Sequence, residues 1–98
     1  RFNSVDPKAA KNYAELGPYV FPNLNINQGT QAVCAEFIDK IEDLSKRLGL
    51  PQKLREVNIP KNACEKMAND AMKQTRLLVN NPRKVTESDA LSIYQSAW

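Results

Sequence analysis

The feature that most constrains the fold of this chain is the stretch 77–94, in which one helix ends and another begins. An apolar run at 77–79 is followed by Asn80 and Asn81, and asparagine tolerates the left-handed conformation that ends many helices. Pro82 then cannot continue a helix, because it lacks an N–H and its ring clashes with the preceding turn. The stretch therefore predicts a corner between two helices.

A helix start follows the proline. Thr86 is predicted to be an N-cap, with Asp89 three residues later in a position related to the capping box, which prefers Glu or Gln there. Arg83 is the strong donor of the turn, and its guanidinium could bond the last carbonyls of the preceding helix. Contact of Arg83 with a phosphate or substrate is the alternative. We therefore interpret one set of residues as a structural motif, namely Asn81, Pro82, Arg83 and Thr86.

The first half of the chain predicts a short helix and an ordered loop. Asp6 and Pro7 are typical of an N-cap and a first helical residue, so a helix is expected from Pro7 to Leu16, ended by Gly17 and Pro18. Its expected apolar face consists of Ala10, Tyr13 and Ala14. The segment 17–29 is expected to be a loop held by Tyr19, Phe21 and Leu24, with a short extended piece at 19–21 and a pocket edge or interface left open.

The clearest helix is expected at 30–48. Its apolar residues recur in steps of four or three and are Val33, Phe37, Ile41, Leu44 and Leu48. Gly49 is expected just after the helix end, and Pro51 prevents continuation. The polar side offers three acid–base pairs at i,i+4 spacing, Glu36–Lys40, Glu42–Lys46 and Asp43–Arg47.

The second half predicts a helical turn and two further helices. Residues 52–58 are expected to form a turn with Leu54 and Val57 facing inward, and Asn62 to cap a helix that runs to about Leu78. Small and flexible side chains mark the face of that helix, namely Cys64, Met67, Ala68, Ala71 and Met72. The last helix is expected from Glu87 to about Ala97. Trp98 is expected to pack on another helix or on a partner, since an exposed terminal Trp would leave a large apolar surface in water.

These elements predict an all-α fold, a small bundle of about four helices within one (sub)domain spanning 1–98. No run is apolar enough to span a bilayer and no signal peptide is visible, so a cytoplasmic protein is expected. The net charge of +3 is spread along the chain, which argues against a nucleic-acid interface. Cys34 and Cys64 are expected to be reduced core thiols, with a disulfide as the alternative.

Candidate chemistry is sparse. The chain contains no histidine, which removes the commonest general base and metal ligand, and its three glycines are isolated rather than gathered in a phosphate loop. The nearest carboxylate pairs are 42–43 and 87/89, and we expect them to be a solvated face and a helix start. Three tyrosines could donate protons, Tyr13, Tyr19 and Tyr94, but a tyrosine at the edge of a core normally uses its hydroxyl in a structural hydrogen bond.

The motif at 81–83, Asn-Pro-Arg, followed by a Thr-capped C-terminal helix, resembles the end of the iron-containing (group III) alcohol dehydrogenases. Arg1-Phe2-Asn3 resembles the segment after the last metal-binding histidine of that family, and Tyr13-Ala14-Glu15 resembles the next helix. Leu48-Gly49-Leu50-Pro51, followed by Leu54-Arg55, resembles a helix-end turn of the family. Ala68, Ala71 and Met72 fall where its penultimate helix carries small and apolar residues.

The resemblance implies the C-terminal part of a dehydroquinate-synthase-like helical domain, cut from a two-domain enzyme. That family holds NAD(P) through a glycine-rich turn in an N-terminal domain, and iron or zinc through one Asp and three His in the helical domain. None of these residues matches a position here, so the resemblance carries over no catalytic, cofactor-binding or metal residue. We expect the isolated chain to be inactive and to bind no cofactor.

The resemblance also implies a partner. The chain would pack on the rest of the parent enzyme, that is, its nucleotide-binding domain and metal-bearing helices, and a homo-oligomer stays open; neither nucleic acid nor a membrane is expected. The alternative hypothesis is a stand-alone helical protein-interaction module.

Overall fold

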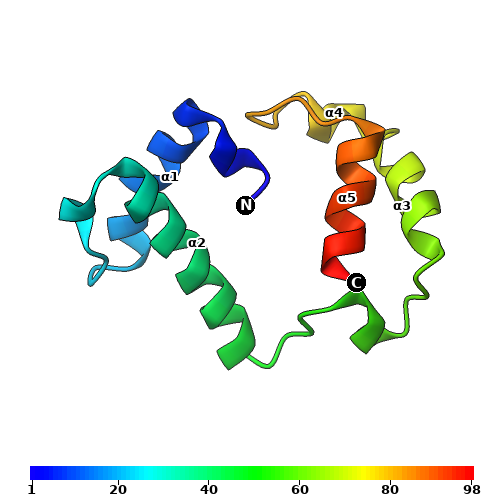
Figure 1. The fold of residues 1–98 in the computed structure, drawn as a ribbon, viewed down its shortest axis with the longest axis horizontal. Coiled ribbons are helices and arrows are strands. Elements are labelled where there is room, and N and C mark those ends of the chain that lie inside the picture. The colour runs from blue at the N-terminus through cyan, green and yellow to red at the C-terminus, as the bar shows by residue number, and fades with distance from the viewer. The chain divides into compact units, whose positions relative to one another are not determined.

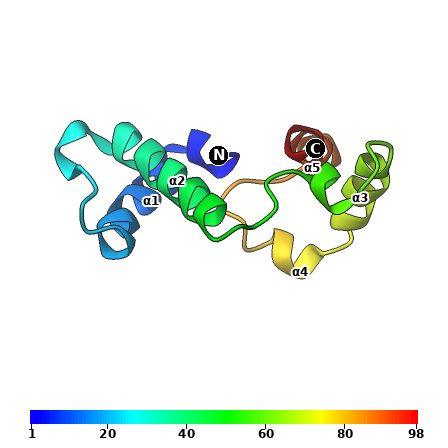
Figure 2. The same ribbon diagram turned by 90° about the horizontal axis from the view of Figure 1, so that it is seen from below.

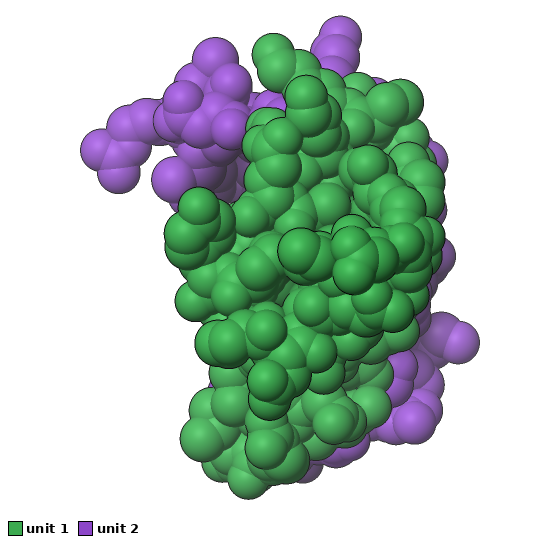
Figure 3. All heavy atoms as spheres, turned by 90° about the vertical axis from the view of Figure 1, so that its left-hand side faces the viewer, with its two compact units in different colours: residues 1–49 green, residues 50–98 purple.

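The computed structural model describes residues 1–98 and contains helices and turns without strands (Figure 1), which confirms the predicted all-α class. The α-helices are α1 (Pro7–Val20), α2 (Thr30–Arg47), α3 (Ala63–Ala71), α4 (Thr75–Leu78) and α5 (Glu87–Ala97). Three 3₁₀ turns accompany them, η1 (Asn3–Val5), η2 (Ile26–Gln28) and η3 (Leu54–Val57). The chain divides into two compact units, residues 1–49 and 50–98, which Figure 3 colours green and purple. The prediction of a single domain stays a prediction.

The first unit is built on α1 and α2. Both ribbon views place α1 beside the N-terminal half of α2 (Figures 1 and 2). Leu24, Val33 and Phe37 form the buried core, and the rings of Phe21 and Phe37 meet edge to face with centroids 5.9 Å apart. Asp6 caps α1 as predicted, because its Oδ1 accepts the Ala9 N–H at 2.9 Å.

The predicted end of the first helix is wrong. Helix α1 continues through Gly17 and Pro18 to Val20, and Phe21 donates its N–H to the Gly17 carbonyl at 2.8 Å. Gly17 is buried, and a Cβ there would lie 3.4 Å from Leu24 Cδ1. The stabilisation from close packing of this turn therefore exceeds two costs: the weak helix propensity of Gly17 and the loss of the backbone hydrogen bond that Pro18 cannot donate.

The loop prediction is correct in part. Leu24 is buried and Phe21 packs against the core, as expected. Tyr19 is 88% exposed and holds nothing in place, and residues 19 and 20 are helical, so the expected extended piece is absent. Because α1 continues to Val20, Phe21 follows directly at its end and packs against the core, whereas Tyr19 lies on the side of the helix that faces away from the core.

Helix α2 has the predicted bounds to within one residue, and Gly49 follows it with φ +73°, as expected of the residue after a helix end. Its apolar stripe is only half buried: Val33 and Phe37 are 4% and 5% exposed, while Ile41, Leu44 and Leu48 are 46%, 37% and 67% exposed. Of the three predicted ion pairs, Glu36–Lys40 and Glu42–Lys46 form, at 3.7 and 2.7 Å.

The second unit packs α3 against α5. Its buried side chains are small, namely Cys64, Ala68 and Ala90. Trp98 packs within this unit as predicted, and its indole N–H donates to the Ile59 carbonyl at 2.9 Å. Arg55 Cζ and Lys61 Nζ lie over its ring, 5.5 and 5.4 Å from the ring centroid. Small residues let two helices approach closely, and the terminal indole then covers the end of the pair.

Three details of this unit differ from prediction. The helix expected to run from Asn62 to about Leu78 is broken at 72–74, where Lys73 and Gln74 donate their N–H groups to carbonyls three residues back. Asn62 is helical in conformation and makes no side-chain cap bond. No glycine or proline marks the break, so tight 3₁₀-type bonds rather than a breaker residue end α3. Val57, expected to face inward, is 47% exposed.

Candidate functional site

The corner after α4 is closed by backbone bonds. Val79, Asn80 and Asn81 donate their N–H groups to the carbonyls of Thr75, Leu77 and Leu78, at 3.0, 3.2 and 3.1 Å. Neither asparagine has a positive φ, so the predicted left-handed ending is wrong; Asn58, with φ 62°, is the non-glycine residue with that conformation. The carbonyls of the last turn already have donors, and the left-handed ending is not needed.

The asparagine side chains bond within the corner. Asn80 Nδ2 donates to the Arg76 carbonyl at 3.1 Å, and Asn81 Nδ2 donates to the Arg83 carbonyl. The second bond spans Pro82 and holds the chain in its turn. Side-chain amides of this kind replace backbone donors where a proline has none.

The start of α5 has the predicted cap. Asp89 donates its N–H to Thr86 Oγ1 at 3.2 Å, and Thr86 donates its own N–H to Asp89 Oδ2 at 2.9 Å, which completes a capping box. The Thr86 hydroxyl also donates to Asp89 Oδ2, at 2.7 Å. This bond is the largest cause of a lowered pKa of Asp89; the bond from the Thr86 N–H and the positive charge of Arg83 lower the pKa further. Arg83 is half-buried, and its positive charge favours the ionised form of the Asp89 carboxyl. Its bonding to the carbonyls of residues 78 and 79 stays a prediction.

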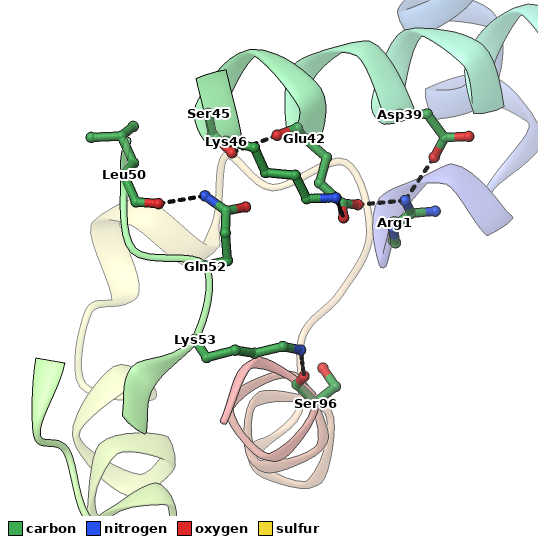
Figure 4. Close-up of polar contacts among 9 residues, drawn as sticks. All are labelled: Arg1, Asp39, Glu42, Ser45, Lys46, Leu50, Gln52, Lys53 and Ser96. Atoms are coloured by element: carbon green, nitrogen blue, oxygen red, sulfur yellow. Dashed lines mark hydrogen bonds and ion pairs between the residues drawn. The ribbon is translucent and has the colours of Figure 1, made fainter. Parts of the chain in front are cut away.

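The other carboxylate candidate lies in an ion-pair network on α2. Lys46 and Arg1 each approach a Glu42 oxygen at 2.7 Å and together lower the pKa of Glu42 to about 2, with Lys46 as the larger cause (Figure 4). Arg1 also binds Asp39 at 2.7 Å. A carboxylate held ionised in this way is a poor proton donor near neutral pH.

The three tyrosines have different surroundings. The Tyr13 hydroxyl accepts a hydrogen bond from Asn3 Nδ2 at 3.2 Å, which fixes η1 to α1. Tyr19 is exposed, and Tyr94 is half-buried on α5. The Tyr13 hydroxyl is thus bonded to an amide and not to a carboxylate that could relay its proton.

A shallow depression lies between α3 and α5, lined by Glu65, Ala68, Glu87, Ser88 and Leu91. Glu87 and Ser88 open α5, so the lining of the depression combines two carboxylates and a hydroxyl with the apolar side chains of Ala68 and Leu91. Acyl transfer needs a base beside the serine, and the lining supplies neither histidine nor lysine.

Side chains that could bind a metal are not clustered in this chain. No group of three or more Cys, Asp or Glu side chains could hold a metal ion. The two thiols, Cys34 and Cys64, are buried and free, and burial raises the pKa of Cys34, which opposes the thiolate that a metal requires. Gly17 lies within α1, Gly29 just before α2 and Gly49 after the end of α2, so the glycines are not gathered in one loop of the kind that binds phosphate.

Sequence reasoning missed the partners of the two chain ends. Arg1 pairs with Asp39 and Glu42 some forty positions away, and Lys53 Nζ donates to the Ser96 carbonyl at 3.2 Å (Figure 4). Local patterns carry no signal for such pairs. No helix of the structure has the length and apolar character needed to cross a membrane.

Comparison with known proteins gives a family match along the whole chain. The protein-family model described as "Fe-containing alcohol dehydrogenase family, C-terminal" matches residues 1–98. A protein named long-chain-alcohol dehydrogenase 1, from Geobacillus thermodenitrificans, is 33% identical over 61 residues, which are 62% of this chain and 15% of the relative. A protein named NADH-dependent butanol dehydrogenase A, from Clostridium acetobutylicum, is 29% identical over 72 residues, which are 74% of this chain and 18% of the relative. The matched regions thus span less than a fifth of either relative, and no solved structure matches the chain.

Proposed function

The chain belongs to the iron-containing alcohol dehydrogenase family, as its C-terminal part, and from this premise we propose that it is the structural helical end of a metal- and NAD(P)-dependent alcohol dehydrogenase. The observation that carries the proposal is the family match over residues 1–98. The intact enzyme would move a hydride between a nicotinamide and an alcohol carbon, with iron or zinc supplying the charge that polarises the oxygen.

The role of the 98 residues themselves is to support the fold. The cap of α5, the bonds of the corner and the α3–α5 packing support this role, because they hold the backbone in place. Under the proposal, the metal ligands and the NAD(P) site lie in the nucleotide-binding domain and metal-bearing helices of the parent. Those parts are the partners of this chain, and the parent is cytoplasmic.

The test compares two polypeptides, the parent and the 98-residue chain. Each is loaded with iron or zinc and assayed with an alcohol and NAD(P) by nicotinamide absorbance. We expect turnover by the parent and none by the isolated chain. Turnover by the isolated chain that is lost on Glu42→Gln or Tyr94→Phe would contradict the structural role.

A second experiment separates structure from ligand binding at Arg83. In the parent, Arg83→Lys keeps the charge and loses the planar fork of donors. We expect the unfolding midpoint to fall and the KM for the nicotinamide to change little, while Lys84→Arg at the exposed neighbour changes neither. An unchanged midpoint with binding about tenfold weaker, roughly 1.4 kcal/mol, would make Arg83 a ligand contact.

The alternative function is a stand-alone interaction module. The exposed apolar side chains favour it, since Leu77 and Val79 are 63% and 78% exposed. The coding sequence upstream of Arg1 distinguishes the two hypotheses. A histidine-bearing helix directly before Arg1 supports the dehydrogenase, whereas a start codon or an unrelated domain there supports the module.

A further inference from the structure

The apolar stripe of α2 extends beyond the core that it helps to build. Val33 and Phe37 are buried, and the same side of the helix continues through Ile41, Leu44 and Leu48, which are 46%, 37% and 67% exposed. In both ribbon views α1 lies beside the N-terminal half of α2 (Figures 1 and 2). An amphipathic helix normally turns such a stripe toward a packing partner.

The ion pairs that Arg1 makes with this helix lie away from the stripe. Arg1 binds Asp39 and Glu42, and at about 100° per residue these two positions fall on the side of α2 opposite Ile41 and Leu44. The N-terminal segment is thus tied to the polar side. It leaves the C-terminal half of the stripe exposed.

One edge of the stripe is basic. Lys40 and Arg47 fall along the same flank of α2, next to Leu44. Lys40 forms an ion pair with Glu36 at 3.7 Å, and Arg47 is exposed in the last turn of the helix. A partner that covers the stripe would gain from acidic residues along this flank.

We propose that Ile41, Leu44 and Leu48 form the docking surface for an amphipathic helix with an acidic flank, supplied by the part of the parent polypeptide outside residues 1–98. The inference rests on the proposed function, because it requires that parent. Length supports this occupant: the matched regions are 15% and 18% of the two relatives, so most of a polypeptide of that kind lies outside this chain. Continuity supports it too, because α1 already covers the same stripe one turn earlier, over Phe37.

The test measures thiol labelling at the stripe. Leu48→Cys is introduced into the 98-residue chain and into the parent, and the rate of reaction with a maleimide is compared; the native thiols are each 1% exposed. We expect labelling to be about tenfold or more slower in the parent, because a docked helix must open before the reagent enters. Asp43→Cys, on the polar side of α2, is the matched control and should react at the same rate in both.

A charge variant tests the acidic flank. Arg47→Glu, combined with Leu48→Cys, should raise the labelling rate severalfold in the parent, while Arg47→Lys should not. Neither change should alter the rate in the 98-residue chain.

The remaining outcomes contradict the proposal. Fast labelling in both polypeptides shows that the stripe faces water in the parent, and slow labelling in both shows that it is covered within the 98 residues. Protection in the parent that disappears on dilution to monomers assigns the surface to a second copy. Dehydrogenase activity is assayed on the same samples, so a parent that is protected but inactive overturns the proposed function and leaves the docking surface intact.

Discussion

The two units of the chain stabilise helices by different means. The unit of residues 1–49 buries large side chains, Leu24, Val33 and Phe37, between α1 and α2. The unit of residues 50–98 buries nothing larger than cysteine, at Cys64, and relies on close packing of α3 on α5. The first unit should therefore be sensitive to the loss of volume and the second to its addition.

The second unit compensates for its small core with directed bonds. The capping box of Thr86, the bond from Trp98 to Ile59 and the bond from Lys53 to Ser96 hold the start and the end of α5. Each contributes on the order of 1 kcal/mol, which is less than a buried phenylalanine contributes. The difference between the units can be tested one substitution at a time.

The largest effect is expected for Phe37→Ala. Phe37 is 5% exposed and meets Phe21, so its removal should leave a cavity and cost about 3–5 kcal/mol. Such a loss is a large part of the stability of a small domain. Urea denaturation followed by far-UV circular dichroism measures it. Tyr19→Ala, at a position that is 88% exposed, is the control and should change the midpoint little; equal effects would show that the first unit has no core of large side chains.

Ala68→Leu should have the next largest effect. Ala68 is 1% exposed at the face of α3 that contacts α5, and added volume there should force the helices apart at about 1–3 kcal/mol. The only tryptophan, Trp98, lies in this unit, so its fluorescence follows the transition. Asn69→Leu adds the same side chain at an exposed position of α3. A stabilising Ala68→Leu would mean that the unit contains space rather than close contact.

Thr86→Ala should destabilise by about 1 kcal/mol, because it removes the acceptor of the Asp89 N–H. Thr86→Ser keeps the hydroxyl and should retain most of the stability. Thermal unfolding of both variants, with Ser88→Ala as a neighbour outside the cap, gives the measurement. If serine is as damaging as alanine, the methyl group and not the cap bond is what α5 requires.

Local signals predicted the elements whose ends are set locally. Asp6, Gly49 and Thr86 act through bonds or dihedral angles within a few residues. The structure places the start of α1, the end of α2 and the start of α5 where these residues predicted. Gly17 is the contrasting case, because its helical conformation depends on contact with Leu24 and Phe37, which come later in the chain. Pattern reading treats such a glycine as a breaker.

In the candidate site, too, features set within a few residues were predictable and features set by distant contacts were not. The Thr86–Asp89 cap was predictable, since both groups lie within one turn. The break between α3 and α4 follows no residue type, and the contacts of Trp98 with Arg55 and Lys61 join positions about forty residues apart. The exposed end of the α2 stripe was not predictable either, because periodicity shows which side of a helix is apolar and not how much of it is covered.

The smallest effect concerns the ion pairs that tie the N-terminus of the first unit to α2. Lys46 and Arg1 lower the pKa of Glu42 from 4.5 to about 2, so the folded state binds this proton less tightly than the unfolded state does. The resulting stability is present above pH 4.5 and is lost as the pH falls toward 2. Glu42 is solvent-exposed, so screening makes the contribution small and sensitive to salt.

Carbon-detected NMR titration of the Glu42 carboxyl and the unfolding temperature between pH 5 and 2 measure this effect. Glu42→Gln should lower the unfolding temperature slightly at neutral pH and flatten its decline in acid, while Glu15→Gln, which removes a looser pair with Lys11 at 3.9 Å, should leave the decline unchanged. Added salt should bring wild type and Glu42→Gln together. A Glu42 that titrates at its ordinary value would show that the N-terminal segment is held by apolar packing and the Asn3–Tyr13 bond, and the first unit would then owe nothing measurable to its charges.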